Sequence, residues 1–251
     1  MSVIHLVRHG RTVLNEARRT QGRCDSPLTP EGRDGAAAVR DYLADVPLRR
    51  AYTSPQGRAV ETARILLERH RGTPLLTVTG LREYDYGVYD GGPDEQMRQA
   101  LDPVHHLPAV LSGTHPGAPG GIAATDYLAD IDAGLARVLA DMRASGRVDE
   151  DVLVVSHGMT IMSLAARWLG TRVFSLAPMA NCSVTTIEVD PTATDGDPHL
   201  LAWALDPAGQ GVTFPSLDLD GAFQGVELVP VDLSRPGPVE QALGPQGPAR
   251  S

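Results

Sequence analysis

The chain has 251 residues, of which 42% are apolar and 21% charged, so it can build a globular core and wholesale disorder is excluded. Its 22 basic residues, all arginine, are outnumbered by 31 acidic ones, and the net charge of −9 argues against a nucleic-acid partner. No apolar run is long enough to cross a bilayer, and the first residues lack the pattern of a signal peptide. Two isolated cysteines, Cys24 and Cys182, argue against a disulfide framework. We therefore expect a cytoplasmic protein without a membrane partner.

Positive charge is concentrated in the first third of the chain. Residues 1–82 contain 14 arginines and 8 acidic residues, a net charge of +6, whereas residues 83–251 contain 8 arginines and 23 acidic residues, a net charge of −15. A cationic segment in an otherwise acidic chain is compatible with a small anionic substrate.

Hydrophobic patterns predict strands that alternate with helices. Short apolar runs predict buried strands at 3–7 and 152–155, and further strands are expected at 50–53 and 75–78. The spacing of apolar residues and the N-cap signal at Thr29-Pro30 predict helices over 30–44, 55–68, 122–142 and 159–169. Two further runs, 184–189 and 200–205, are expected to form antiparallel edge strands.

This order of elements predicts an α/β three-layer sandwich, with a mainly parallel sheet, helices on both faces and an antiparallel edge strand. Residues 1–205 are expected to form the functional domain. Within it, 8 of the 20 residues at 102–121 are Gly or Pro, which predicts a long irregular loop. This loop is expected to lie over the ligand pocket that the residues discussed below indicate. Residues 206–251 form a Pro/Gly-rich acidic extension with little regular structure expected beyond Ser234. This extension is expected to lie away from the pocket, against the domain or a second subunit, and a homodimer is compatible with the sequence.

Two histidines occupy equivalent places at the ends of buried strands. Arg8-His9-Gly10 follows the first strand, and His157 stands between the strand at 152–155 and the next helix. Open α/β sheets bind ligands at the carboxyl ends of their strands, and the amino end of a helix offers free N–H groups to an anion. Arg8 and Arg58 could add bidentate hydrogen bonds to oxyanion oxygens. Together these groups indicate a phosphate pocket.

The motifs around these residues resemble those of the histidine phosphatase superfamily, which includes phosphoglycerate mutases and many phosphatases. Five motifs occur in the family's order and approximate spacing: Arg8-His9-Gly10-x-Thr12-x-x-Asn15, Asp25-Ser26-Pro27-Leu28-Thr29-x-x-Gly32, Thr53-Ser54-Pro55-x-x-Arg58-Ala59-x-x-Thr62-Ala63, Leu81-x-Glu83-x-x-x-Gly87 and Val155-Ser156-His157-Gly158. The chain departs from the family's pattern at several positions near the expected mouth of the pocket, among them Arg11, Gln56 and Tyr89-Asp90-Gly91. These departures leave the identity of the substrate open.

The resemblance implies that residues 1–205 are a catalytic domain in which His9 is the nucleophile and forms a phosphohistidine. It further implies that Arg8, Arg58 and His157 hold the phosphoryl oxygens and neutralise the charge of the transition state. The implied function is that of a metal-independent phosphomonoester hydrolase acting on a small phosphorylated metabolite.

Glu83 is implied as the general acid that protonates the leaving oxygen and then as the base that activates water, with Asp85 as its competitor. Neither a metal nor another cofactor is implied. The resemblance also suggests further contacts to the phosphate or its loop, at Asn15, Ser54 and Gly158.

Two other functions are compatible with these residues. A phosphoglycerate mutase would enclose a second phosphate, but Glu83 and His157 are only 74 positions apart and few arginines lie between them, so hydrolysis is favoured. A non-catalytic phospho-ligand-binding regulator would have no need of a nucleophile and an acid together. His105, His106 and His115 could suggest a zinc site, but no cysteine or carboxylate ligands accompany them. We therefore interpret them as loop histidines without a metal.

Overall fold

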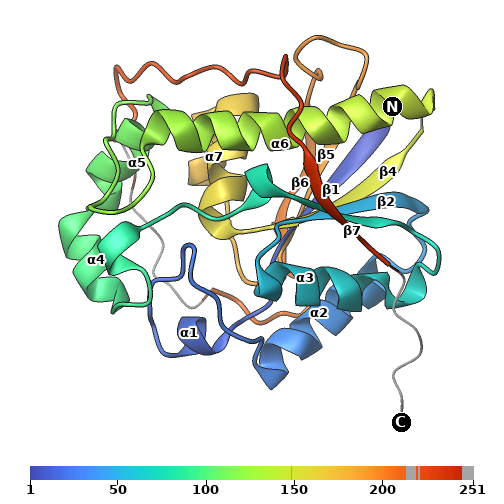
Figure 1. Cartoon of the computed structure of the whole chain (residues 1–251), viewed down its shortest axis with the longest axis horizontal. Helices are drawn as coiled ribbons and strands as arrows, with labels where there is room; N and C mark the ends of the chain where they lie inside the picture. The colour runs from blue at the N-terminus through green and yellow to red at the C-terminus, as the bar shows by residue number, and fades with distance from the viewer. Residues whose placement is uncertain (148, 213–218, 220, 245–251) are drawn as a thin grey trace.

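The computed structural model describes residues 1–147, 149–212, 219 and 221–244. Its strands are β1 (Ser2–Arg8), β2 (Leu48–Thr53), β3 (Leu75–Val78), β4 (Asp151–Ser156), β5 (Val184–Val189), β6 (His199–Leu205) and β7 (Val239–Leu243). They form one sheet in the order β6-β5-β1-β4-β2-β3-β7 (Figure 1). The four central strands, β1, β4, β2 and β3, are parallel, whereas β5, β6 and β7 pair antiparallel at the two sides.

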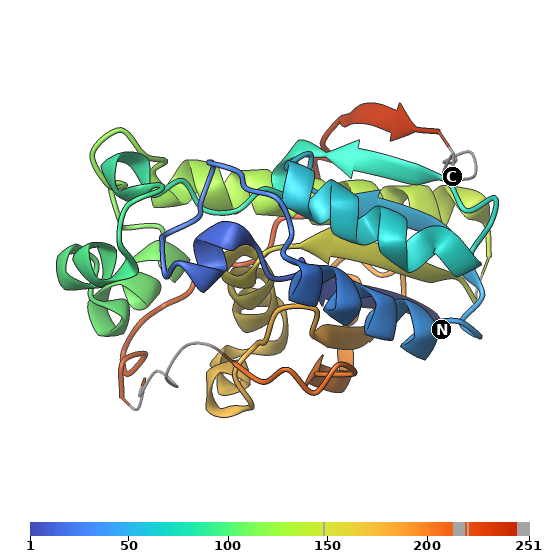
Figure 2. The same cartoon turned by 90° about the horizontal axis from the view of Figure 1, so that it is seen from below.

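Helices cover both faces of this sheet (Figures 1 and 2). Helices α2 and α3 lie on one face and α6 and α7 on the other, which confirms the predicted three-layer sandwich. The α-helices are α1 (Val13–Glu16), α2 (Pro30–Tyr42), α3 (Gly57–Leu66), α4 (Asp94–Ala100), α5 (Pro103–Leu111), α6 (Ala124–Ser145) and α7 (Gly158–Leu169). No helix in the described part of the chain is long and apolar enough to cross a membrane.

The alternation of side chains along the strands creates two cores. Ile4 and Leu6 of β1 belong to the cluster shared with α6 and α7, while Val7 belongs to the cluster shared with α2 and α3. Leu153 and Val155 of β4 also face α2 and α3. Because both faces of β1 and β4 are covered, these two strands are mostly apolar along their length, which is why the sequence indicates them so clearly.

The predicted start of α2 is confirmed. The hydroxyl of Thr29 accepts a hydrogen bond from the backbone N–H of Gly32 at 3.0 Å, and Pro30 fills the first helical position. The cap fixes where the chain turns back toward the sheet. It also places Gly32 directly against the backbone of Arg11, so that a Cβ added at Gly32 would clash with the backbone oxygen of Arg11.

Residues 102–121 differ from the predicted irregular loop, because 103–111 form helix α5. Asp102 caps this helix by accepting from the N–H of Val104 at 3.2 Å, and Pro103 occupies its first position. Asp102-Pro103 is a helix-start signal in the sequence, but the many Gly and Pro residues in the rest of the segment favoured a loop prediction. Helix α4, which precedes it, was not predicted either.

The prediction of little regular structure beyond Ser234 is wrong for the described residues, since β7 pairs with β3 at one edge of the sheet. Before β7, the extension runs along α6 (Figure 1). Arg167 holds it there by donating to the backbone oxygens of Val229 and Pro230, both at 2.7 Å. The same guanidinium forms a bidentate ion pair with the buried carboxylate of Asp132, at 2.8 Å for each bond. Tertiary contacts, rather than local pattern, therefore order this segment.

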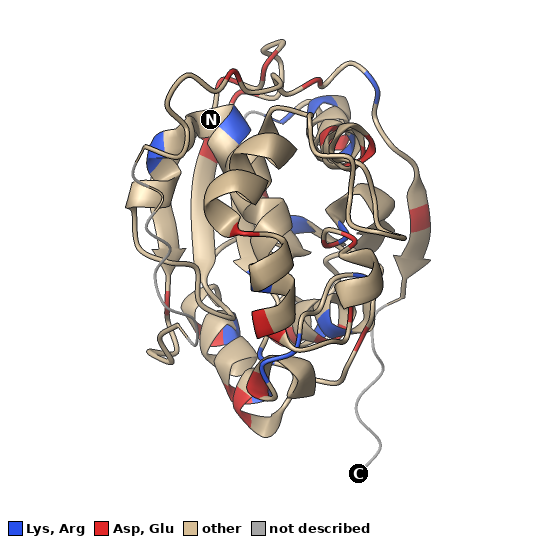
Figure 3. Ribbon diagram, turned by 90° about the vertical axis from the view of Figure 1, so that its left-hand side faces the viewer, with Lys and Arg blue, Asp and Glu red and all other residues tan. Residues whose placement is uncertain are grey.

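Acidic and basic residues are interspersed over the elements (Figure 3). The excess of arginine in the first third of the sequence thus does not translate into a separate basic lobe in that view.

Candidate active site

Strand pairing brings the two predicted histidines together. β1 and β4 are parallel neighbours in which Arg8 is paired with Ser156, so both chains leave the sheet at the same edge. The residues that follow, His9 and His157, have ring centroids 5.1 Å apart at an interplanar angle of 59°. The carboxyl edge of the sheet thus places two imidazoles side by side.

Hydrogen bonds fix the tautomer of His9. Its Nδ1 lies 2.8 Å from the carbonyl oxygen of Gly10, which can only accept, so Nδ1 carries the proton. Nε2 is then unprotonated and accepts a hydrogen bond from Nε of Arg58 at 3.2 Å. Burial, and next the positive charges of Arg58 and Arg8, hold the pKa of His9 well below 6.5. The imidazole is therefore neutral at neutral pH and has a lone pair on Nε2.

His157 is fully buried, and burial followed by the charge of Arg58 lowers its pKa well below 6.5. Neither of its ring nitrogens has a hydrogen-bond partner among the described residues. Buried polar atoms are normally paired, and an unpaired one costs about 1–3 kcal/mol. The neutral ring of His157 is therefore able to donate a hydrogen bond to an anion that binds beside His9.

Arg8 and Arg58 approach His9 in different ways. Arg8 donates to the backbone oxygen of Met179 at 2.7 Å, and its Nε has no partner among the described residues. Arg58, only 1% exposed, donates to the carbonyl oxygens of Gly22 at 2.9 Å and Cys24 at 2.8 Å besides His9. Most N–H groups of Arg58 are thus already used, and Arg8 is the more available of the two for direct contact with an anion.

The carboxylate of Glu83 lies at the amino end of α7. Its Oε2 accepts from the N–H of Met159 at 3.0 Å, and its Oε1 accepts from the N–H of Thr160 at 3.1 Å. The Thr160 hydroxyl at 3.1 Å and the N–H of Tyr84 at 2.9 Å also donate to Oε1. The expectation that this helix offers free N–H groups to phosphate is therefore wrong for its second and third residues. Their N–H groups already donate to the carboxylate of Glu83, which occupies the position expected for the phosphate.

The three residues expected as secondary contacts have different surroundings. Asn15 lines the cavity described below and accepts from the N–H of Thr12 at 3.2 Å. Gly158 also lines that cavity, and a Cβ added there would lie 3.5 Å from the guanidinium carbon of Arg8. Ser54 does not line it. Its hydroxyl is buried and bonds to the side chain of Gln56 at 3.3 Å.

Gln56 connects several parts of the site. Its Oε1 accepts from the N–H of Glu83 at 2.9 Å, and its Nε2 donates to the carbonyl of Gly22 at 2.7 Å. Gln56 therefore holds the segment that carries Glu83 against the loop that bonds Arg58. The sequence marked Gln56 only as a departure from the family's pattern.

Sequence reasoning missed a second group, the loop before β5. The side-chain amide of Asn181 donates to the carbonyl of His9 at 3.0 Å, and the N–H of Cys182 donates to the carbonyl of Arg8 at 3.1 Å. Cys182 adopts a left-handed φ of 58°, which marks a backbone held by its surroundings. This loop reaches the site only because β5, which follows it, pairs antiparallel with β1. No local sequence motif indicated this position.

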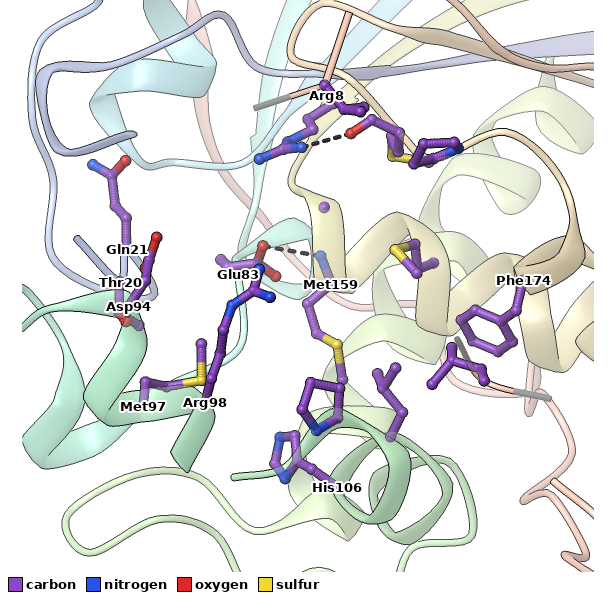
Figure 4. A pocket seen from close by; sticks show the side chains of 18 of the residues that line it. Arg8, Thr20, Gln21, Glu83, Asp94, Met97, Arg98, His106, Met159 and Phe174 are labelled. Carbon is purple, nitrogen blue, oxygen red and sulfur yellow. Dashed lines mark hydrogen bonds between the residues drawn. The ribbon is translucent and has the colours of Figure 1, made fainter. Parts of the chain in front are cut away.

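A cavity of about 280 Å³ opens beside these groups (Figure 4). Arg8, Glu83 and Gly158 line it, whereas His9, His157 and Arg58 are buried and do not. Pro103, His106 and Leu107 of α5 line it as well. The expectation that the C-terminal extension lies elsewhere is wrong for two of its residues, which are part of the wall, Val212 and Leu219.

The remaining candidates are placed as follows. Asp85 accepts from the N–H of Gly87 at 3.0 Å and does not line the cavity, so Glu83 is the better placed of the two acids. His106 and His115 form an edge-to-face pair at 4.4 Å, and His105 is exposed beside Asp102. In the described part of the chain, these histidines gather no set of three metal-ligating side chains.

Comparisons with known proteins agree with this geometry. The model of the histidine phosphatase superfamily (branch 1) matches residues 4–204. A probable phosphoglycerate mutase of Salmonella choleraesuis is 30% identical over 219 residues, which cover 82% of this chain and 98% of that protein.

Two solved structures are similar as well. The mycobacterial glucosyl-3-phosphoglycerate phosphatase has a TM-score of 0.65 at 27% identity, covering 80% of this chain and 98% of its own. A phosphoglycerate mutase from Bacillus anthracis has a TM-score of 0.68 at 25% identity, covering 81% and 92%. Family match, fold and paired buried histidines together show that this chain belongs to the histidine phosphatase superfamily, enzymes that act on phosphate esters.

Proposed function

We propose that this protein hydrolyses phosphomonoesters through a phosphohistidine at His9. The observation that carries the proposal is the protonation state of His9, whose Nδ1 donates to Gly10 and whose Nε2 is left unprotonated. A neutral imidazole with a fixed tautomer is a nucleophile, and the cations of Arg8 and Arg58 favour a phosphate dianion beside it.

In the first step, Nε2 of His9 exchanges its 3.2 Å hydrogen bond with Arg58 for the phosphorus atom. The N–P bond forms while the ester P–O bond breaks, and the leaving oxygen takes a proton from the carboxyl group of Glu83. Arg8 and His157 donate to the phosphoryl oxygens and offset their charge.

In the second step, water attacks phosphorus and gives a proton to the carboxylate of Glu83. The N–P bond breaks and returns its electron pair to His9. Of the two carboxyl oxygens, Oε2 accepts a single hydrogen bond and is the one with room for the transferred proton.

The alternative, transfer of the phosphoryl group to a second organic acceptor, draws support from the relatives named as phosphoglycerate mutases. A mutase substrate carries a second anionic group. The cavity beside Glu83 contains Arg19 and Arg98 as well as the carboxylate of Asp94, but Arg98 is already partnered and acts on Asp94, and most of the remaining wall is apolar. Hydrolysis is therefore the better supported reading.

The test is the fate of the phosphoryl group. With phenyl phosphate as substrate, we expect release of inorganic phosphate, an acid-labile and base-stable phosphoenzyme on rapid quenching, and one oxygen from isotopically labelled water in each phosphate. The phosphoenzyme and turnover are expected to disappear in His9→Ala, with the fold retained. His115→Ala serves as a matched control outside the paired histidines.

Other outcomes identify the alternatives. Phosphate passed to added glycerate in preference to water would establish a mutase. Vanadate binding without any turnover would indicate a phospho-ligand-binding regulator. Turnover by His9→Ala at more than about a tenth of the wild-type rate would refute the assignment of the nucleophile.

A further inference from the structure

The cavity has two chemically different sides. Figure 4 shows Thr20, Gln21 and Asp94 on one side of Glu83, and Met159 and Phe174 on the other. The side of Asp94 is polar, and the hydroxyl of Thr20 donates to its carboxylate at 3.1 Å. The other side is apolar and comes from α7, the 3-10 helix Thr171–Ser175, β6 and the C-terminal extension.

The apolar side is preformed. The ring of Phe174 stacks on Phe223 of the extension, with centroids 4.8 Å apart and planes within 5°. The indole N–H of Trp203 donates to the carbonyl of Ala177 at 2.7 Å, so its polar atom is already satisfied. Rigid apolar walls of this kind favour an apolar ligand because little side-chain entropy is lost on binding.

Charges of both signs line the rest of the cavity. Besides the Arg8 cation next to His9, it contains Arg19, whose Nε donates to the carbonyl of Gly91, and Arg98, which has a partner in the protein and acts electrostatically on Asp94. Asp94 contributes a carboxylate whose pKa is raised by burial, and which would repel an anionic ligand whenever it is ionised.

His106, at the α5 end of the cavity, contributes no positive charge. It is 7% exposed, and burial lowers its pKa to about 4, so the ring is neutral at neutral pH. A leaving group that reaches this end of the cavity therefore meets a neutral ring, whose two nitrogens have no hydrogen-bond partner among the described residues.

We propose that the cavity selects phosphomonoesters whose alcohol is large and apolar, an aromatic ring or an alkyl chain, over phosphorylated acids and sugars. This inference rests on the proposed function, in that the phosphate is held at His9 and Arg8 while the alcohol extends between Met162, Phe174 and Trp203. The class of reaction that supplies such a substrate is the phosphorylation of a hydrophobic alcohol.

Binding of n-alkylphosphonates tests the inference without depending on turnover. The series from ethyl to octyl keeps one headgroup, which cannot be hydrolysed, and adds only methylene groups. Because a buried methylene contributes about 0.8 kcal/mol, we expect the Kd, measured by calorimetry, to fall roughly two- to fourfold for each methylene until the cavity is filled. A Kd that changes less than about twofold over the whole series would overturn the inference.

A pair of matched variants locates the effect. Leu176 lines the cavity and is 45% exposed, whereas Leu201 on β6 is 56% exposed and outside it. Because both side chains reach solvent, lysine is tolerated at either position. We expect Leu176→Lys to flatten the dependence on chain length and Leu201→Lys to leave it unchanged. Equal slopes in the two variants would place the alkyl chain elsewhere and overturn the inference.

Turnover separates this inference from the proposed function. Length-dependent phosphonate binding without release of phosphate from any alkyl or aryl phosphate would overturn the hydrolase and retain the apolar site. Release of phosphate from phosphoglycerate at a higher kcat/KM than from hexyl phosphate would overturn the apolar site and retain the enzyme.

Discussion

Glu83→Gln tests the role of the acid most sharply, because the structure shows what the substitution changes. A glutamine oxygen in place of Oε1 still accepts from Tyr84 and Thr160, while its NH₂ group faces the N–H of Met159 in place of Oε2. Three charge-assisted hydrogen bonds become neutral, at roughly 1 kcal/mol each, and one N–H loses its acceptor, at about 1–3 kcal/mol. We expect the free energy of unfolding to fall by about 3–5 kcal/mol, since neighbouring bonds are not additive.

The catalytic effect is measured as a ratio within one variant. Hexyl phosphate needs a proton on its leaving oxygen and nitrophenyl phosphate does not, so their kcat/KM ratio reports the acid and is independent of the folded fraction. General acid catalysis contributes about 100- to 10,000-fold, so we expect this ratio to fall by at least about 100-fold in Glu83→Gln. Asp85→Asn, the neighbouring acid outside the cavity, is the matched control. An unchanged ratio in Glu83→Gln, or a larger change in Asp85→Asn, would refute the assignment.

Three further predictions concern stability. His106 has a pKa of about 6.5 when unfolded and about 4 when folded, so between these values the unfolded state binds more protons and the free energy of unfolding decreases by about 1.4 kcal/mol for each unit that the pH is lowered. His106→Phe should remove that slope in denaturant titrations, and an unchanged slope would contradict the burial argument. Arg167→Ala leaves the buried Asp132 carboxylate without its ion-pair partner, which should lower the free energy of unfolding by about 3–5 kcal/mol. The variant should also expose the extension to protease. Unchanged resistance to protease would show that other contacts are enough to hold the extension in place. Thr29→Ala removes the cap on Gly32 and should cost about 1 kcal/mol at unchanged kcat, and a changed kcat would link α2 to the site.

The sequence by itself determined the central fold and which imidazole and guanidinium groups gather at its edge. Continuous apolar runs mark β1 and β4 because both of their faces are buried, and parallel strands end at one edge of the sheet. His9 and His157 follow those runs directly, so their proximity could be deduced from chain order alone. The motif at Thr53–Ala63 likewise indicated Arg58 beside them, although not the hydrogen bond to His9.

Only the tertiary structure decided how these groups are held and what surrounds them. Asn181 reaches His9, and β7 reaches β3, through pairings between residues distant in sequence, which leave no periodic signal. Glu83 takes the N–H groups of α7 because packing brings the two segments together, although local pattern suggested that those groups were free. The apolar side of the cavity is assembled from α7, the 3-10 helix Thr171–Ser175, β6 and the extension, and a wall built from four separate segments exists only once the chain has folded.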